Sequence, residues 1–189
     1  MSLRPESLFD LRGRVAIVTG ASSGLGVTFA RGLAAAGARL ALAARRKERL
    51  EALAAELSAG GAESLAVPCD VSREADVDAL VAQVLARFGR IDVLVNNAGT
   101  VHMGPAEDEP IARFREIVDV NLNGVFLCAQ RVGRVMLAAR SGSIVNVSSI
   151  LGLVASGQVR QASYCASKGA VVNLTRELAA QWARRGVRV

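Results

Sequence analysis

Tyr164 and Lys168 are the residues whose types and spacing suggest chemistry most directly. Tyr164 is the chain's single tyrosine, and Lys168 follows four positions later in Tyr164-Cys165-Ala166-Ser167-Lys168. On a helix, residues four apart share a face, with their Cβ atoms roughly 5–6 Å from each other. An ammonium group nearby favours the ionised phenol, and such a phenol can exchange a proton with a carbonyl or alcohol oxygen. The pair predicts acid/base catalysis at Tyr164, although the same spacing also occurs by chance on many helices.

Two neighbouring serines precede this pair. Residues 143–147 predict an apolar strand, and Ser148-Ser149 follow at its carboxyl end. A hydroxyl at that edge can donate a hydrogen bond to a substrate oxygen and hold it in place. The residues alone leave two alternatives open. Either serine could have this role, and Ser-Ser at a strand end can also be an ordinary turn.

A glycine-rich turn near the amino terminus predicts a phosphate-binding site. The turn reads Thr19-Gly20-Ala21-Ser22-Ser23-Gly24-Leu25-Gly26 and joins a predicted strand to a predicted helix. Glycines let the backbone approach a pyrophosphate without Cβ clashes. The helix start offers free N–H groups and the positive end of the helix dipole. Three residues separate Gly20 from Gly24, which differs from the G-x-G-x-x-G spacing, but the position still predicts a nucleotide site.

The end of the second predicted strand indicates which nucleotide binds. An NAD site usually has an acid about 20 residues beyond the glycines, where it holds the ribose 2′-hydroxyl. This strand ends in Ala44-Arg45-Arg46, and the first carboxylate is Glu48, within the next predicted helix. Two guanidinium groups can bind a 2′-phosphate. The sequence therefore favours NADP(H), with NAD(H) possible and a solvated helix start as the purely structural alternative.

Short apolar segments alternate with longer amphipathic segments along the chain. We expect strands over 15–19, 39–44, 64–68, 93–96 and 143–147, and helices over 24–36, 47–59, 72–88, 111–139 and 162–182. Ser72 is the expected N-cap of the third helix, and Gly124 is an expected bend in the fourth. Continuous apolar strands are typical of parallel sheets covered on both faces. The pattern predicts a single-domain α/β fold with a doubly wound parallel sheet, whose ligands bind at the carboxyl ends of the strands.

The composition argues against several other classes. The chain has 189 residues and is 51% hydrophobic, which suits one domain with a real core. Its net charge is +6, but the arginines are scattered singly and aromatic residues make up only 4%, unlike a nucleic-acid-binding surface. No apolar stretch reaches the length of a membrane span. We expect a cytoplasmic protein with no nucleic-acid or membrane partner, no metal near the single histidine His102, and reduced, buried thiols at Cys69, Cys128 and Cys165.

Several ordered motifs together resemble the short-chain dehydrogenase/reductases in their single-domain form. The resemblance covers essentially the whole chain after about Leu11. It rests on the glycine turn, Cys69-Asp70-Val71, Asn96-Asn97-Ala98-Gly99, Asn121 within Val120-Asn121-Leu122-Asn123-Gly124, Ser149, and Tyr164 with Lys168. It implies an N-terminal arm over residues 1–10 and a Rossmann-type dinucleotide-binding and catalytic domain over 11–189. It also implies hydride transfer between NADP(H) and a small-molecule carbonyl or alcohol substrate, in a homotetramer or homodimer.

The resemblance implies a role for each matching position. Residues of the glycine turn would contact the diphosphate and adenosine: Gly20, Ser22, Ser23, Gly24, Leu25 and Gly26. Asp70 would bind the adenine amine with Val71 beside the ring, and Asn97, Ala98 and Gly99 would contact the ribose. Asn121 would support a water that relays protons to Lys168. Ser149 would hold the substrate oxygen, Tyr164 would exchange the proton and also contact the cofactor, and Lys168 would bind the nicotinamide ribose; Ser148 stays an alternative to Ser149.

Two departures from the family pattern matter. The segment between Ser149 and Tyr164 is slightly longer than in many members, through residues 158–161. Since this segment borders the substrate site, the identity of the substrate and the physiological direction stay open. The chain also ends at Val189, where the family's sixth strand begins and members continue. We therefore expect the sequence to be truncated at its carboxyl end, with apolar flanks of the sheet and last helix facing water.

Two other functions fit parts of the pattern. Extended relatives that epimerise or dehydrate nucleotide sugars share the tyrosine–lysine pair, but they are longer and usually have two residues between their first glycines. A non-catalytic NADP-binding sensor or assembly subunit would keep the fold without the activity. Such proteins tend to lose catalytic positions, and all four are present here: Asn121, Ser149, Tyr164 and Lys168.

Overall fold

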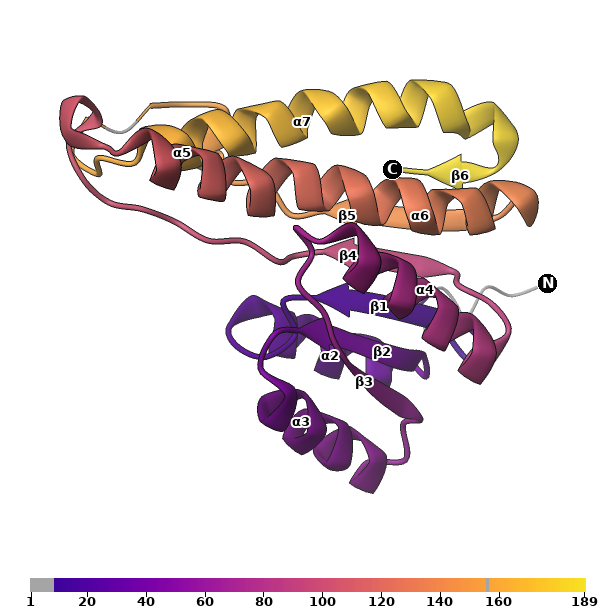
Figure 1. Cartoon of the computed structure of the whole chain (residues 1–189). Helices are drawn as coiled ribbons and strands as arrows, with labels where there is room; N and C mark the ends of the chain where they lie inside the picture. Colours follow the sequence, from indigo (N-terminus) through magenta and orange to yellow (C-terminus); the bar gives the residue numbers. More distant parts are fainter. Residues whose placement is uncertain (1–8, 156) are drawn as a thin grey trace.

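Six parallel strands form one sheet in the order β3-β2-β1-β4-β5-β6 (Figure 1). The computed structural model describes residues 9–155 and 157–189, so most of the expected N-terminal arm lies outside the described residues. The strands are β1 (Val15–Thr19), β2 (Arg39–Ala44), β3 (Ser64–Pro68), β4 (Val93–Asn96), β5 (Gly142–Asn146) and β6 (Val187–Arg188). Strands β1 to β4 have the predicted bounds, and β5 begins and ends one residue earlier than predicted. The predicted α/β, doubly wound fold is confirmed.

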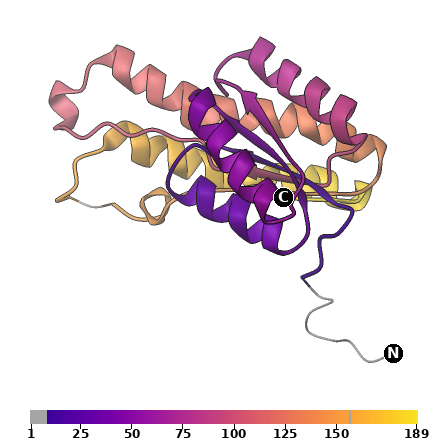
Figure 2. The same cartoon turned by 90° about the horizontal axis from the view of Figure 1, so that it is seen from below.

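Helices cover both faces of this sheet (Figures 1 and 2). They are α2 (Leu25–Ala35), α3 (Lys47–Ala59), α4 (Glu74–Phe88), α5 (Ile111–Val118), α6 (Gly124–Ala138) and α7 (Ala162–Trp182). Alternate residues of β1 face different cores. Ala16 and Val18 pack in the cluster that includes buried residues of α2 and α3, whereas Val15 and Ile17 pack in the cluster that includes α4, α6 and α7. Both faces of the strand are therefore buried, as expected for a parallel sheet.

Two apolar side chains in the described strands are exposed, Pro68 at the end of β3 and Val145 in β5. Val145 of β5 is 50% exposed although β5 lies between β4 and β6. By contrast, Trp182 at the end of α7 is only 8% exposed and lies against Gly133 of α6. Val145 is thus exposed on one face of the sheet, whereas Trp182 is covered by α6.

The predicted start of α4 was wrong, and the helix expected over 111–139 is irregular just before Gly124. Arg73, not Ser72, is the N-cap of α4, because the Ser72 hydroxyl instead donates to the Asp70 carboxylate at 2.7 Å. The expected bend at Gly124 is a π-helical turn over Asp119–Asn123, which separates α5 from α6. A Cβ on Gly124 would lie 2.8 Å from the Val71 side chain, so glycine allows the start of α6 to approach the segment after β3.

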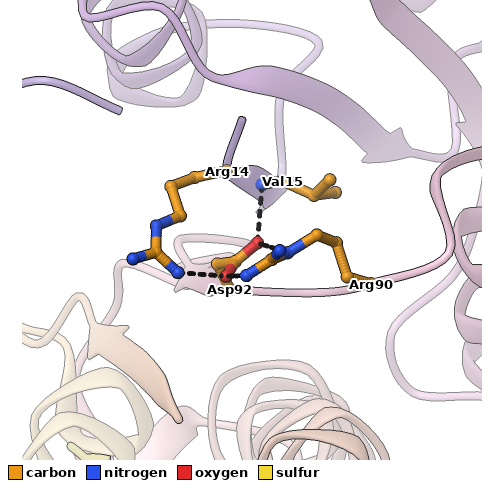
Figure 3. A network of polar contacts seen from close by, with 4 residues as sticks. All are labelled: Arg14, Val15, Arg90 and Asp92. Atoms are coloured by element: carbon orange, nitrogen blue, oxygen red, sulfur yellow. Dashed lines mark hydrogen bonds and ion pairs between the residues drawn. The ribbon is translucent and has the colours of Figure 1, made fainter. Parts of the chain in front are cut away.

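A buried carboxylate ties two strands together at the amino edge of the sheet (Figure 3). Asp92, 8% exposed, accepts hydrogen bonds from the backbone N–H of Val15, from Arg14 and from Arg90, at 2.6 to 2.9 Å. Burial by itself raises the pKa of Asp92, but these hydrogen bonds outweigh it and the net effect is a lowered pKa. This cluster fixes the starts of β1 and β4, and so helps to place their carboxyl ends at the opposite edge.

Candidate active site

A cavity of about 550 Å³ lies at the carboxyl ends of β1 to β4. It is lined by eleven residues predicted to bind the cofactor: Gly20, Ser22, Ser23, Leu25, Arg45, Arg46, Asp70, Val71, Asn97, Ala98 and Gly99. Gly24, Gly26, Tyr164 and Lys168 are the predicted cofactor residues outside this lining. The volume is within the usual range of small-molecule sites, and the position is the one expected for ligands of a doubly wound sheet.

The glycine turn leaves the start of α2 open to an anion. Gly20 has φ +67°, and a Cβ there would lie 2.9 Å from the Ala98 backbone. A Cβ on Gly26 would lie 2.3 Å from the Gly20 carbonyl oxygen, so the helix packs against the turn without side chains. Gly24 is the N-cap of α2 and provides no side-chain cap, and the first turn holds no acid. The residues therefore fit a pyrophosphate at this helix start.

Arg46 lies directly over the glycine turn. Its guanidinium donates hydrogen bonds to the Ser22 hydroxyl at 2.9 and 3.2 Å and to the Ser23 hydroxyl at 2.7 Å. These three side chains line the cavity together with Arg45. The predicted arginines and serines are thus brought together, and they form a cationic, hydroxyl-rich corner suited to a phosphate group.

Asp70 and its neighbours form another part of the cavity wall. Burial raises the pKa of Asp70, but hydrogen bonds from Ser72 and the charges of Arg45 and Arg73 outweigh this effect and leave the pKa lowered. The carboxylate is therefore ionised at neutral pH and can accept a hydrogen bond from a ligand. Burial, reinforced by Asp76 and Asp70, raises the pKa of the neighbouring Cys69 thiol to about 12. Cys69 and Cys128 are buried free thiols as predicted, while Cys165 is only half-buried.

Thr19 and Asn97 fix the ends of β1 and β4 relative to each other. The Thr19 hydroxyl donates to the Val95 carbonyl and accepts from the backbone N–H groups of Asn97 and Ala98, both at 3.0 Å. The Asn97 side chain donates back to the Thr19 carbonyl at 2.9 Å. Thr19 was not among the predicted site residues. Its signal in the sequence is a polar side chain at the end of a buried strand, immediately before the first glycine of the turn.

Lys168 is the buried cation of the site. It is 4% exposed, and its Nζ donates to the Val147 carbonyl at 2.7 Å. The same nitrogen lies 5.8 Å from the centroid of the Tyr164 ring, so the predicted shared face on α7 is observed. Burial lowers the pKa of Lys168. A Cβ on Gly99 would lie 3.7 Å from this Nζ, which places the ammonium group next to the lining of the cavity.

Asn121 lies in the π-helical turn and is fully buried. Its side-chain oxygen accepts from the Thr100 N–H at 2.8 Å, and its amide donates to the Thr100 carbonyl and to Ser167 Oγ. Ser167 Oγ in turn donates to the Tyr164 carbonyl at 2.8 Å. The side chain of Asn121 therefore joins the segment after β4 to the helix that carries Tyr164. Single-turn π-helices inside longer helices are frequent at functional sites.

The two neighbouring serines have different hydrogen bonds. The Ser148 hydroxyl donates to the Lys168 carbonyl at 2.8 Å, so its proton is already used. The Ser149 oxygen accepts from the Leu151 N–H at 3.1 Å, and its own proton stays available for a ligand oxygen. The geometry therefore allows Ser149 to donate to a substrate while Ser148 holds the backbone of α7.

A phenol, an ammonium group and a free hydroxyl donor thus lie at the carboxyl end of β5, beside a cavity whose lining would suit an anion. Residues 14–189 match the family described as short chain dehydrogenase. The chain belongs to the short-chain dehydrogenase/reductase family. The α/β fold, the motifs and their order are those of this family of oxidoreductases. The predicted family is confirmed.

Two relatives illustrate the range of known activities. The chain is 45% identical over 181 residues to a D-threitol dehydrogenase from Mycolicibacterium smegmatis. The match covers 96% of this chain and 69% of the relative. It is 39% identical over 180 residues to a 3-oxoacyl-[acyl-carrier-protein] reductase from Synechocystis sp., covering 95% and 72%. One name describes the oxidation of an alcohol, and the other describes the reduction of a carbonyl group.

Two solved structures share the fold closely. A short-chain type dehydrogenase/reductase from Mycobacterium marinum has a TM-score of 0.96 and 37% identity, covering 99% of this chain and 76% of its own. A gluconate 5-dehydrogenase from Burkholderia cenocepacia, in complex with NADP and tartrate, has a TM-score of 0.92 and 38% identity, and the match covers 97% of this chain and 71% of that structure.

Within the described part of the chain, none of the helices has the length and apolarity to cross a bilayer.

Proposed function

We propose that this protein is an NADP(H)-dependent oxidoreductase that interconverts an alcohol and a carbonyl compound, with Tyr164 as the general acid/base. The observation that carries this proposal is the position of Lys168, which is buried, 2.7 Å from the Val147 carbonyl and 5.8 Å from the Tyr164 ring centroid. Such a placement keeps a positive charge against the phenol at the carboxyl edge of the sheet, next to the cavity.

Each group has a defined task in the reduction of a carbonyl compound. The reduced nicotinamide, when bound, supplies a hydride. Ser149 donates its free hydroxyl proton in a hydrogen bond to the substrate oxygen and orients it. Tyr164 gives its phenolic proton to that oxygen, and Lys168 stabilises the resulting phenolate. Asn121 positions this helix through Ser167 and, as the family resemblance implies, supports the water that returns a proton by way of Lys168.

The preference for NADP(H) over NAD(H) rests on the corner formed by Arg45, Arg46, Ser22 and Ser23. The cavity lining has guanidinium groups, and no carboxylate, at the end of β2, where an NAD site usually has an acid. Arg46 is already held toward the turn by both serine hydroxyls. A 2′-phosphate would be bound by paired, charge-assisted hydrogen bonds.

A substrate screen with NADPH and NADP⁺ tests the proposed reaction. The panel should contain D-threitol, gluconate and a 3-oxoacyl thioester, because these are the kinds of compound that the relatives' names report. Turnover that depends on a cofactor is the expected result. Tyr164→Phe should abolish turnover while the dissociation constant of NADPH stays within about threefold, because loss of a general acid/base typically costs 10²–10⁴-fold in rate.

Two results would contradict the proposal. Full turnover by Tyr164→Phe would exclude the phenol as acid/base. Tight NADPH binding without turnover on any substrate would favour the non-catalytic sensor or assembly subunit.

We further propose a cytoplasmic homodimer or homotetramer, as the family resemblance implies. Native mass spectrometry of the protein should detect the corresponding multiple of its mass.

A further inference from the structure

A hydrogen bond joins Glu109 to the first turn of α7. Ser163 is completely buried and immediately precedes Tyr164. Its hydroxyl donates to Glu109 Oε1 at 2.5 Å, across 54 residues of sequence. Glu109 is half-buried and follows the short 3₁₀ helix Ala106–Asp108, in the segment between β4 and α5. Figures 1 and 2 show this segment and the start of α7 at the same end of the molecule.

The start of α7 lacks a cap of its own. Gln161 is the N-cap residue and makes no side-chain cap hydrogen bond, and the first turn of the helix has no acidic residue. A helix start without a cap leaves N–H groups unpaired and carries the positive end of the dipole. The carboxylate of Glu109 places a negative charge at this helix start from another segment, and it is bound there through the Ser163 hydroxyl.

Further contacts bind the same two segments together. The N–H of Gly104 donates to the Arg160 carbonyl at 2.9 Å, just before α7 begins. On the other side of Tyr164, Ser167 is held by Asn121, which is itself held by both backbone groups of Thr100. The Tyr164 backbone therefore lies between two anchored positions, one before it and one three residues after it.

We infer that Glu109 is a positioning residue for Tyr164. By accepting a hydrogen bond from the Ser163 hydroxyl, its carboxylate fixes the first turn of α7 and thereby keeps the phenol in place relative to Lys168 and Ser149. This inference rests on the proposed function, because it assigns Glu109 to the reaction through Tyr164. Nothing in it requires Glu109 to contact the substrate or the cofactor.

Four variants test the inference. Glu109→Ala and Ser163→Ala each remove the hydrogen bond and should lower kcat about tenfold, since misplacement of a reacting group by about 1 Å can cost up to 10² in rate. KM and the dissociation constant of NADPH should stay unchanged. Glu109→Gln keeps an acceptor oxygen and should restore most of kcat. Glu107→Ala removes a neighbouring exposed acid and should behave as wild type.

Amide hydrogen exchange over residues 161–168 gives a second readout that needs no substrate. Exchange should increase in Glu109→Ala and Ser163→Ala, and it should stay at the wild-type rate in the other two variants. The double variant Glu109→Ala, Ser163→Ala should match either single variant, because both remove the same bond.

The outcomes separate this inference from the proposed reaction. Unchanged exchange in Glu109→Ala would overturn the inference whatever the activity. Increased exchange with an unchanged kcat would also overturn it, because the helix start would then not position the phenol. A rise in KM alone would assign Glu109 to substrate contact instead. If wild-type protein shows no turnover, the proposed function fails, and increased exchange would then show only that Glu109 holds the helix.

Discussion

Substitution of Arg45 and Arg46 should shift cofactor preference from NADPH toward NADH. In the structure Arg46 makes three hydrogen bonds to the hydroxyls of Ser22 and Ser23, so its guanidinium is oriented before any ligand binds. Arg45 is close enough to Asp70 to contribute to the lowering of that carboxyl's pKa. Pre-oriented donors lose little conformational entropy on binding, which increases their contribution to affinity.

The magnitude follows from the number and exposure of these donors. A hydrogen bond to a charged group contributes about 1.5–3 kcal/mol, and the lower end applies because both arginines are exposed. Arg46→Ala should therefore weaken NADPH binding about 10- to 30-fold. Combining it with Arg45→Asp also places a carboxylate beside the phosphate site, and the loss should then exceed about 100-fold. NADH has no 2′-phosphate, so its dissociation constant should change much less.

Fluorescence titration with both dinucleotides measures the effect. The quantity to compare is the ratio of the two dissociation constants, because a general disturbance of the fold affects both and cancels. Arg49→Ala is the matched control, since Arg49 is an exposed arginine in α3 that does not line the cavity. If the ratio of dissociation constants in the double variant equals that of wild type, these arginines do not bind the 2′-phosphate. The proposed preference for NADP(H) would then have to be withdrawn.

Three further predictions concern groups whose contacts are well defined. Ser149→Ala should lower kcat by about 100-fold or more, the usual effect of losing a donor to the reacting oxygen, whereas Ser148→Ala should keep most of kcat and lower the free energy of unfolding by about 1 kcal/mol; equal losses of kcat would contradict the different roles. Asp92→Asn should lower the free energy of unfolding by about 2–3 kcal/mol at neutral pH. Because folding lowers the pKa of Asp92, this difference should shrink as the pH falls below about 4, and a difference independent of pH in denaturant titrations would disagree with the ionised carboxylate. Gly26→Ala places a Cβ 2.3 Å from the Gly20 carbonyl oxygen and should weaken binding of both dinucleotides, or lower the unfolding free energy by about 1–3 kcal/mol; normal affinity with normal stability would show that the turn can relax.

Most of the fold could be predicted from the sequence because the strands are continuous apolar segments with sharp ends. The all-buried β1, for example, is bounded by Arg14 and Gly20, so its limits are visible in the residue types. The π-helical turn at Asp119–Asn123 could not be predicted, since helical periodicity continues through it. The N-cap of α4 was missed because Ser72 has two possible partners, and the choice of Asp70 depends on the turn that the backbone makes after β3.

The site shows a similar division. Motif order located the turn, the arginines, Asp70, Asn121 and the tyrosine–lysine pair at one edge of the sheet, since each follows a predicted strand or lies on a predicted helix. The family resemblance favoured Ser149 over Ser148, but the residue types alone left both open, because their different hydrogen bonds depend on the packing of α7 against the end of β5. Glu109 was not among the predicted site residues, and its partner is Ser163, 54 residues later in the chain. A local pattern of residues cannot predict a contact between positions this far apart in the sequence.

The bond between Lys168 Nζ and the Val147 carbonyl has a consequence for how mutants of this lysine are interpreted. In addition to its proposed action on the phenol, the ammonium group donates a hydrogen bond to a backbone oxygen at the end of β5, so its removal leaves this oxygen without that donor. A small amine added in solution to a Lys168→Ala variant can restore a positive charge but cannot reconnect helix and strand through the chain. The activity that an added amine fails to restore would therefore measure what the connection between helix and strand contributes, separately from the positive charge.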